Sequence, residues 1–146
     1  MKIVVLVGLP GSGKSTYVER TGVSAISSDH VRQLLVDDAT NQNIHRRVFA
    51  TLRYLVRQRL ALRRPVTYVD ATNLTRWERR PYIRLAQLHD AEAEALFFDV
   101  PVEVCQERNR ARARIVPERA ILEMTARLVP PSVAEGFSKV EVLRYP

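Results

Sequence analysis

The feature that most constrains this chain is a glycine-rich run that directly follows a short apolar segment near its start. Residues 8–15, GLPGSGKS, match the pattern G-x-x-x-x-G-K-[ST]. Residues 3–7 are continuously apolar, as in a strand buried on both faces of a parallel sheet, and we predict that they form the central strand. A helix is expected to begin near Lys14. This order of strand, turn and helix favours a phosphate site over a Gly-Pro-Gly turn that only joins two elements.

The residue types in the run suit a nucleoside triphosphate. Gly11 and Gly13 let backbone amides turn toward one centre, and the helix N-terminus adds partial positive charge. Lys14 can reach the outer phosphates, and the Ser15 hydroxyl can bind Mg²⁺. We therefore predict a site for ATP and Mg²⁺. The predicted nucleotide contacts are Gly8, Leu9, Pro10, Gly11, Ser12, Gly13, Lys14, Ser15 and Thr16.

Apolar runs and helical patterns alternate along the rest of the chain. Further strands are expected at residues 25–27, 66–69, 95–98 and 140–143, and the clearest helical patterns cover residues 41–63, 75–89 and 102–112. Such alternation gives a parallel sheet with ligands at the carboxyl ends of its strands. We predict an α/β fold of the kinase-type P-loop NTPases: a five-stranded parallel sheet sandwiched by helices, with a short arginine-bearing lid, as one domain over residues 1–146.

The charge and the cysteine content of the chain indicate its kind of binding partner and its cellular compartment. The formal net charge is +7, which favours a polyanionic partner such as nucleic acid or nucleotide. Of the 23 cations 20 are Arg, a bias that genome composition explains at least as well as phosphate binding does. Cys105 is the one cysteine, and no segment approaches the roughly 18 apolar residues of a membrane helix. We expect a cytoplasmic protein with no membrane partner, in which Cys105 serves helix packing.

A second set of polar residues follows the second and third expected strands. Asp29 should emerge at the same sheet edge as the glycine-rich run, with Arg32 one helical turn later on the same side. Phosphate transfer to a hydroxyl needs a carboxylate that accepts the proton and cations that hold the phosphates. Asp70 can bind Mg²⁺ through water or order Thr72 and Asn73, which we predict to contact the acceptor. Two alternatives stay open: Asp29 as a helix N-cap with Arg32 as a surface cation, and Asp70 as the cap of the next helix.

Four arginines fall within seven residues after the fourth expected strand: Arg108, Arg110, Arg112 and Arg114. Arg108 and Arg112 share one helical face, and the other two share another. Such a helix can close over a nucleotide and stabilise the charge on the transferred group, and Arg112 is the first candidate for the γ-phosphate. A solvated basic helix end is the alternative, and it applies more to Arg110 and Arg114.

Together these motifs resemble the kinase domain of 5′-OH polynucleotide kinases, within the P-loop kinases related to zeta toxin and AAA_33. The stretches GLPGSGKST, SSDHVR, YVDATNLTRWERR and FFDVPVEVCQERNRARARIVP carry the resemblance, which covers most of the chain. The resemblance implies transfer of the γ-phosphate of ATP to the 5′-hydroxyl of a DNA or RNA end. The roles it implies are Lys14 and Ser15 on ATP and Mg²⁺, Asp29 as general base, Arg32 on the acceptor phosphate, and Arg108 and Arg112 in the lid.

A second concentration of arginines runs from residue 45 to residue 84. The spacing places four of them on one stripe of the long helix: Arg46, Arg53, Arg57 and Arg64. Such a stripe can track a nucleic-acid backbone, although a solvated face explains it more simply. Aromatic side chains that could stack on bases are Trp77, Tyr17 and Tyr82. The helical pattern around Trp77 favours a core position instead.

Two other functions are compatible with these motifs. A kinase of a small hydroxylated metabolite or antibiotic would use the same scaffold, and a non-catalytic ATP-binding module would need only the nucleotide site. The positive charge argues mildly against the first. Asp29, Arg32 and the lid arginines argue against the second. Association with a separate phosphatase or ligase is a further hypothesis.

Overall fold

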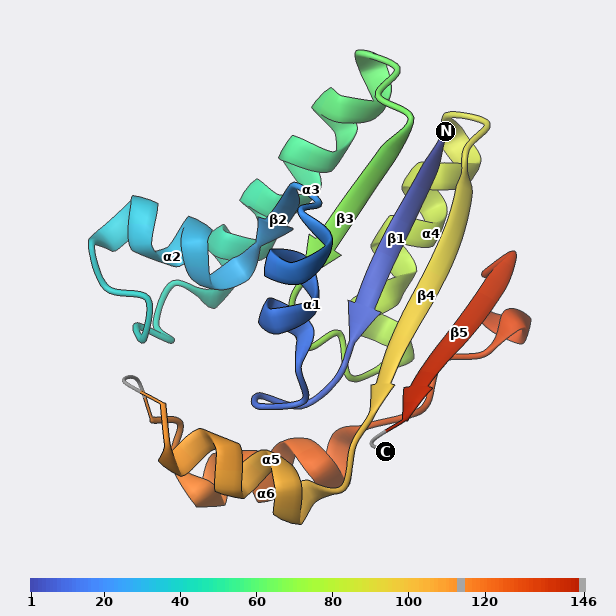
Figure 1. Ribbon diagram of the computed structural model, residues 1–146. Helices are drawn as coiled ribbons and strands as arrows, with labels where there is room; N and C mark the ends of the chain where they lie inside the picture. The colour runs from blue at the N-terminus through green and yellow to red at the C-terminus, as the bar shows by residue number, and fades with distance from the viewer. Residues whose placement is uncertain (113–114, 145–146) are drawn as a thin grey trace.

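The computed structural model, which describes residues 1–112 and 115–144, has a five-stranded parallel sheet at its centre (Figure 1). The strands are β1 (Lys2–Val7), β2 (Ala25–Ser27), β3 (Val66–Asp70), β4 (Glu92–Asp99) and β5 (Lys139–Arg144). Their order in the sheet is β2-β3-β1-β4-β5. The predicted central position of β1 is confirmed, because β1 pairs in parallel with β3 on one side and β4 on the other.

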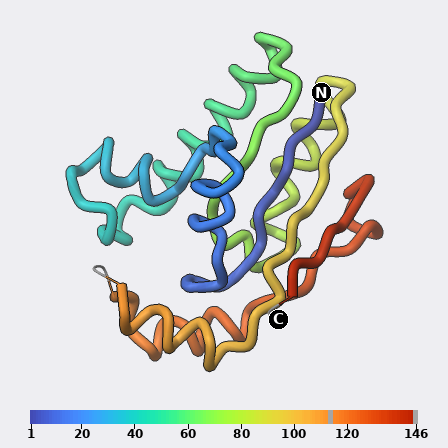
Figure 2. Tube along the Cα trace, viewed as in Figure 1, coloured from blue at the N-terminus to red at the C-terminus, as the bar shows by residue number. Residues whose placement is uncertain are grey.

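Helices cover both faces of the sheet. α1 (Lys14–Thr21) lies on one face, and α3 (His45–Ala61) and α4 (Arg76–Leu88) lie on the other (Figure 1). α2 (Ser28–Val36) follows β2 directly. α5 (Val102–Arg110) and α6 (Glu118–Arg127) run side by side beneath the carboxyl ends of β1 and β4, and a short 3₁₀ turn, η1 (Val133–Glu135), leads into β5 (Figure 2).

Alternation along β1 divides the core into two layers. Ile3, Val5 and Val7 pack against α3 and α4, whereas Val4 and Leu6 pack against α1. Because successive side chains of a strand point to opposite faces, a continuously apolar strand needs cover on both sides. α3 supplies this cover with four buried residues at helical spacing: Val48, Leu52, Val56 and Leu60.

Two predictions about the helices are wrong. The long helix ends at Ala61, so Arg64 lies beyond it and the predicted stripe keeps only its first three arginines. Trp77 is 77% exposed rather than in the core, because it lies on the side of α4 opposite the buried Arg79 and Ala86. Tyr82 is on that face and fully buried, so it cannot stack on a base.

Among the described residues, no helix combines the length and the apolar character needed to cross a membrane.

Candidate active site

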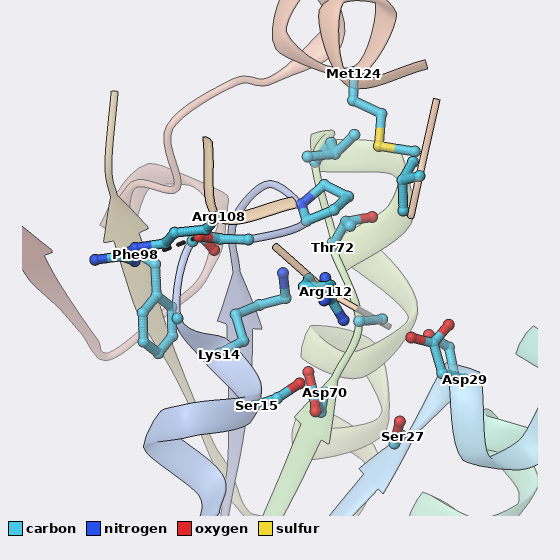
Figure 3. Close-up of a pocket in the computed structure, with 18 of the residues that line it drawn as sticks. Lys14, Ser15, Ser27, Asp29, Asp70, Thr72, Phe98, Arg108, Arg112 and Met124 are labelled. Atoms are coloured by element: carbon cyan, nitrogen blue, oxygen red, sulfur yellow. Dashed lines mark hydrogen bonds between the residues drawn. The ribbon is translucent and has the colours of Figure 1, made fainter. Parts of the chain in front are cut away.

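A cavity of about 1180 Å³ runs along the carboxyl ends of β2 and β3, the edge at which a parallel sheet is expected to bind ligands. One end is lined by residues 10–16, and the other by Asp29, Arg32, His45 and Glu78. Pockets for a single ligand typically measure about 300–1000 Å³, so this cavity has room for two reactants. Figure 3 shows side chains from both ends pointing into the space between them.

The glycine-rich run leads into α1 through two left-handed residues. Gly11 and Gly13 have φ angles of 82° and 103°, a region that favours glycine. A Cβ on Gly11 would lie 2.6 Å from the carbonyl oxygen of Cys105, so close packing against α5 also requires glycine there. The Ser12 hydroxyl is buried and has no hydrogen-bond partner among the described residues. An unsatisfied buried hydroxyl in this loop fits a phosphate group as its partner.

The Lys14 ammonium is buried inside the run, where it donates to the carbonyl oxygens of Gly8, at 2.8 Å, and Leu9, at 3.0 Å. Burial lowers the pKa of Lys14 to about 8, although the carboxylates of Asp70 and Asp29 oppose the shift. Gly8 and Leu9 do not line the cavity, and their contact with the nucleotide stays a prediction. An anion beside this ammonium would raise its pKa again.

Ser15 and Asp70 lie on the same side of the cavity, at the start of α1 and the end of β3 (Figure 3). Burial raises the pKa of Asp70, and the Lys14 ammonium opposes this shift. Thr75 is the N-cap of α4 and accepts from the backbone N–H of Glu78 at 3.2 Å, so the alternative in which Asp70 caps that helix is wrong.

A hydroxyl and a carboxylate fit Mg²⁺, which uses few protein ligands and completes its octahedron with phosphate oxygens and water. Ser15 and Asp70 are the residues placed to hold it. No group of three or more His, Cys, Asp or Glu side chains within the described ranges could hold a metal ion by itself. A bound nucleotide would therefore have to contribute ligands.

Asp29 and Arg32 lie in the first turns of α2, at the other end of the cavity. Their side chains form an ion pair at 3.2 Å, with Asp29 50% exposed and Arg32 only 5% exposed. Ser27 is the N-cap of α2 and accepts from the backbone N–H of His30 at 3.3 Å, so Asp29 is not the cap and Arg32 is not a surface cation. The Arg32 Nε is buried without a partner in the described structure, which leaves it a donor for an anionic group.

Two arginines approach the glycine-rich run from beneath the sheet. Arg108 donates from Nη1 to the carbonyl oxygen of Gly11 at 3.3 Å. Arg112 lines the cavity close to Lys14, and its positive charge contributes to the lowered pKa of that lysine (Figure 3). The structure thus brings both lid arginines predicted from the sequence to the nucleotide end of the cavity.

Comparison with known proteins places this arrangement in a family. Residues 3–131 match the model of a family described as an AAA domain, AAA_33. The chain belongs to the AAA_33 family. The comparison with curated protein sequences found no match to this chain.

Solved structures that share the fold of this chain include the following three. A chain of the Pnkp1/Rnl/Hen1 RNA repair complex has a TM-score of 0.71 and 23% identity, over 87% of this chain and 43% of that chain. A gluconokinase from Sinorhizobium meliloti 1021 has a TM-score of 0.64 and 18% identity, over 99% and 84%. The APS kinase CysC of Mycobacterium tuberculosis, in complex with AMPPNP and APS, has a TM-score of 0.62 and 19% identity, over 97% and 87%. The predicted kinase-type P-loop fold is confirmed, and the domain spans less than half of the repair-complex chain.

Thr72 and Asn73, which follow β3 in the AAA_33 domain, have different surroundings. Thr72 lines the cavity, and its contact with the acceptor stays a prediction. Asn73 does not line the cavity: it is 1% exposed, and its amide donates to the carbonyl oxygens of Leu6, at 2.8 Å, and Ala71, at 3.3 Å. A contact between Asn73 and the acceptor also stays a prediction. Asn73 holds the loop after β3 against β1.

Asn109, a residue not predicted from the sequence, ties the end of α5 to the segment before α6. Its buried amide donates to the carbonyl oxygen of Val116 and accepts from the Val116 N–H at 2.9 Å. Arg110, from the same helix end, pairs with Glu118 on the surface at 2.6 Å, in keeping with a solvated role. Arg114 lies outside the described residues. No spacing signal distinguishes Asn109 from its arginine neighbours.

Arg79 was also missed, although its side chain is fully buried. Its guanidinium forms a two-point ion pair with Glu135, at 2.9 and 3.0 Å. It also donates to the carbonyl oxygens of Asn73, Leu74 and Val129. Arg79 stands among other arginines, and nothing in its spacing distinguishes it from them. The local signal in the sequence is the S-x-x-E capping box that ends in Glu135, the ion-pair partner of Arg79. This network fixes the loop after β3, which borders the cavity.

Proposed function

We propose that the protein transfers the γ-phosphate of ATP to the 5′-hydroxyl of a nucleic-acid end. The observation that carries the proposal is the single cavity that contains the glycine-rich run at one end and the Asp29–Arg32 pair at the other. Phosphoryl transfer requires donor and acceptor to be held together in line, away from bulk water. One cavity with room for both meets this requirement.

At the nucleotide end, residues 10–16, which include Lys14, would bind the triphosphate. The backbone amides and the ammonium would hold the phosphates, with Thr16 on an inner phosphate. Mg²⁺ on Ser15 and Asp70 would neutralise charge on the outer phosphates. Arg108 and Arg112 would stabilise the charge that develops on the transferred group.

At the acceptor end, Asp29 would take the proton from the attacking hydroxyl. The hydroxyl oxygen forms a bond to the γ-phosphorus, the bond from that phosphorus to the bridging oxygen breaks, and ADP leaves with the electron pair. Arg32 would hold a phosphate of the acceptor, since its buried Nε has no protein partner in the described structure. Thr72 would contact the acceptor between the two ends.

Two observations support nucleic acid as the acceptor. The net charge of +7 suits a polyanion. The fold is shared with a chain of an RNA repair complex, a similarity that supports the choice without deciding it. Association with a phosphatase or ligase belongs to the same proposal.

The test is an acceptor screen with γ-labelled ATP and Mg²⁺. Single-stranded DNA and RNA oligonucleotides with a 5′-hydroxyl should become labelled, and the same oligonucleotides with a 5′-phosphate should not. Failure to label any 5′-hydroxyl end, combined with labelling of a small alcohol, would contradict the proposal.

A kinase of small hydroxylated molecules is the second candidate. Polar side chains at the acceptor end could hydrogen-bond to several hydroxyls: Thr40, Gln42 and Glu78. Salt separates the two candidates, because polynucleotide binding weakens by about 0.7 log units per log unit of salt for each neutralised phosphate of a single strand. A neutral sugar should show a flat salt response.

A further inference from the structure

A second cavity, of about 700 Å³, lies between α3 and α4, on the face of the sheet opposite α1. We call it the arginine groove. It is lined by Arg46, Ala50, Arg53, Arg57, Trp77, Arg80, Pro81, Arg84 and Leu85. Five of these residues are arginines and none is acidic, so the groove concentrates positive charge outside the catalytic cavity.

The charge of the groove is not neutralised by neighbouring carboxylates. α3 contains no Asp or Glu. The one acidic residue of α4, Glu78, is engaged by the backbone N–H of Leu74, at 3.0 Å, and by Arg127, at 2.5 Å. Within residues 1–112 and 115–144, none of the groove arginines forms an ion pair with a carboxylate. A polyanion would therefore find five guanidinium groups without an acidic partner.

Trp77 adds an aromatic surface to the arginines. Trp77 lines the groove and is 77% exposed. Tryptophan side chains are on average largely buried in folded proteins, so this exposure is unusual. A basic groove that also presents an aromatic face is the combination that binds single-stranded nucleic acid, because phosphates contact the cations and bases stack on the ring. An acidic protein would bind to the arginines through its carboxylates, but it would offer no base to stack on the indole.

Residues adjacent in the sequence line the groove and the acceptor end of the catalytic cavity. On α3, His45 lines the cavity and Arg46 lines the groove; on α4, Glu78 lines the cavity and Trp77 lines the groove. From Arg46 to Arg57 the helix rises by about 16 Å, at about 1.5 Å per residue. That length corresponds to about four or five nucleotides at about 3.4 Å each in a stacked strand.

We propose that the arginine groove binds the single-stranded segment that continues from the 5′ end held in the catalytic cavity, with phosphates on the arginines and a base on Trp77. The direction of the strand rests on the proposed function, whereas nucleic-acid binding in the groove does not. The groove would therefore select long acceptors over short ones.

Trp77 is the chain's one tryptophan and gives a direct readout. Binding of unlabelled 12-nucleotide single strands, DNA and RNA, should quench its fluorescence, while binding itself is followed by anisotropy of the same strand labelled at its 3′ end. ATP alone should leave the emission unchanged, because the glycine-rich run leads into α1, on the opposite face of the sheet from the groove. Unchanged emission at concentrations that saturate the anisotropy would overturn the proposal.

Charge reversal tests the arginines. The double variant Arg57→Glu with Arg84→Glu changes one exposed residue on each helix. The control is Arg47→Glu, because Arg47 is an exposed arginine of α3 that lines neither cavity. The double variant should bind the 12-mer at least ten-fold more weakly and lower the salt slope by about 1.4 for two lost phosphate contacts. The control should stay within about three-fold of the unmodified protein. Equal binding by the double variant would overturn the proposal.

Three further outcomes test which kind of partner binds the groove and whether the groove serves the proposed reaction. Displacement of the 12-mer by poly-glutamate at equal charge concentration would identify an acidic protein as the occupant and overturn the proposal. If the protein labels 12-mers and 5′-OH dinucleotides with the same KM, the groove does not serve the reaction and the inference fails while the kinase proposal stands. If nothing is labelled but groove-dependent binding persists, the kinase proposal fails and the groove stands as a nucleic-acid site.

Discussion

Lys14 links nucleotide binding to pH. Its pKa is lowered to about 8 by burial, and a triphosphate beside the ammonium would favour the charged form again. The complex therefore binds more protons than the free protein above about pH 8, so affinity should fall as pH rises through that value. Calorimetry at pH 8.5 in buffers of different ionisation enthalpy should report proton uptake on binding. Lys14→Arg stays charged and should abolish the uptake; uptake that persists in this variant would contradict the assignment.

Asp29 is the residue on which catalysis depends in this account. Asp29→Asn keeps the shape of the side chain but removes the base, so kcat should fall by about 10²- to 10⁴-fold while ATP affinity changes by no more than about two-fold. Asp37→Asn is the control, because Asp37 is an exposed residue at the end of the same helix, with a φ of 58° that asparagine tolerates. Rapid-quench measurement of labelled product gives kcat. An unchanged kcat in Asp29→Asn would contradict the role of Asp29 as the general base.

At the scale of elements, Asn109 ties α5 to the segment that begins α6. Asn109→Ala removes both hydrogen bonds to Val116 and should loosen the connection that carries Arg112. We expect kcat to fall by about ten-fold or more, because a displaced cation stabilises the transferred phosphate poorly. Arg110→Ala breaks only the exposed pair with Glu118 and should change kcat by less than about two-fold. Equal effects of the two substitutions would contradict a positioning role for Asn109.

The elements themselves were readable from the sequence because each follows a repeating physical pattern. The apolar run of β1 and the helical spacing of Val48, Leu52 and Val56 predicted their places in the core. Asn109 and Arg79 escaped detection because their roles depend on partners distant in the chain or on the course of a loop, which no local spacing encodes. Trp77 was misplaced because the apolar residues of α4 lie on two faces: Trp77 and Leu88 are exposed, whereas Ile83 and Leu85 are buried.

At the scale of the whole molecule, the buried pair of Arg79 and Glu135 joins α4 to the segment before β5. Glu135→Gln leaves the guanidinium charge uncompensated in a buried site, so the free energy of unfolding should fall by about 3 kcal/mol. Glu123→Gln is the control, because the side chains of Arg119 and Glu123 are 91% and 66% exposed, and it should cost less than about 0.5 kcal/mol. Urea denaturation measures both. A loss below about 1 kcal/mol for Glu135→Gln would contradict the role assigned to the pair.

The proposed reaction requires the terminal phosphate of the nucleotide to lie between Lys14 and Asp29 in one cavity. A crystal structure with Mg²⁺, a non-hydrolysable ATP analogue and a 5′-OH oligonucleotide measures this directly. We expect the acceptor oxygen within about 3.5 Å of the γ-phosphorus and hydrogen-bonded to Asp29, with Arg112 on the same phosphate. A triphosphate whose γ-phosphorus faces away from Asp29, or an oligonucleotide end bound outside the cavity, would contradict the account.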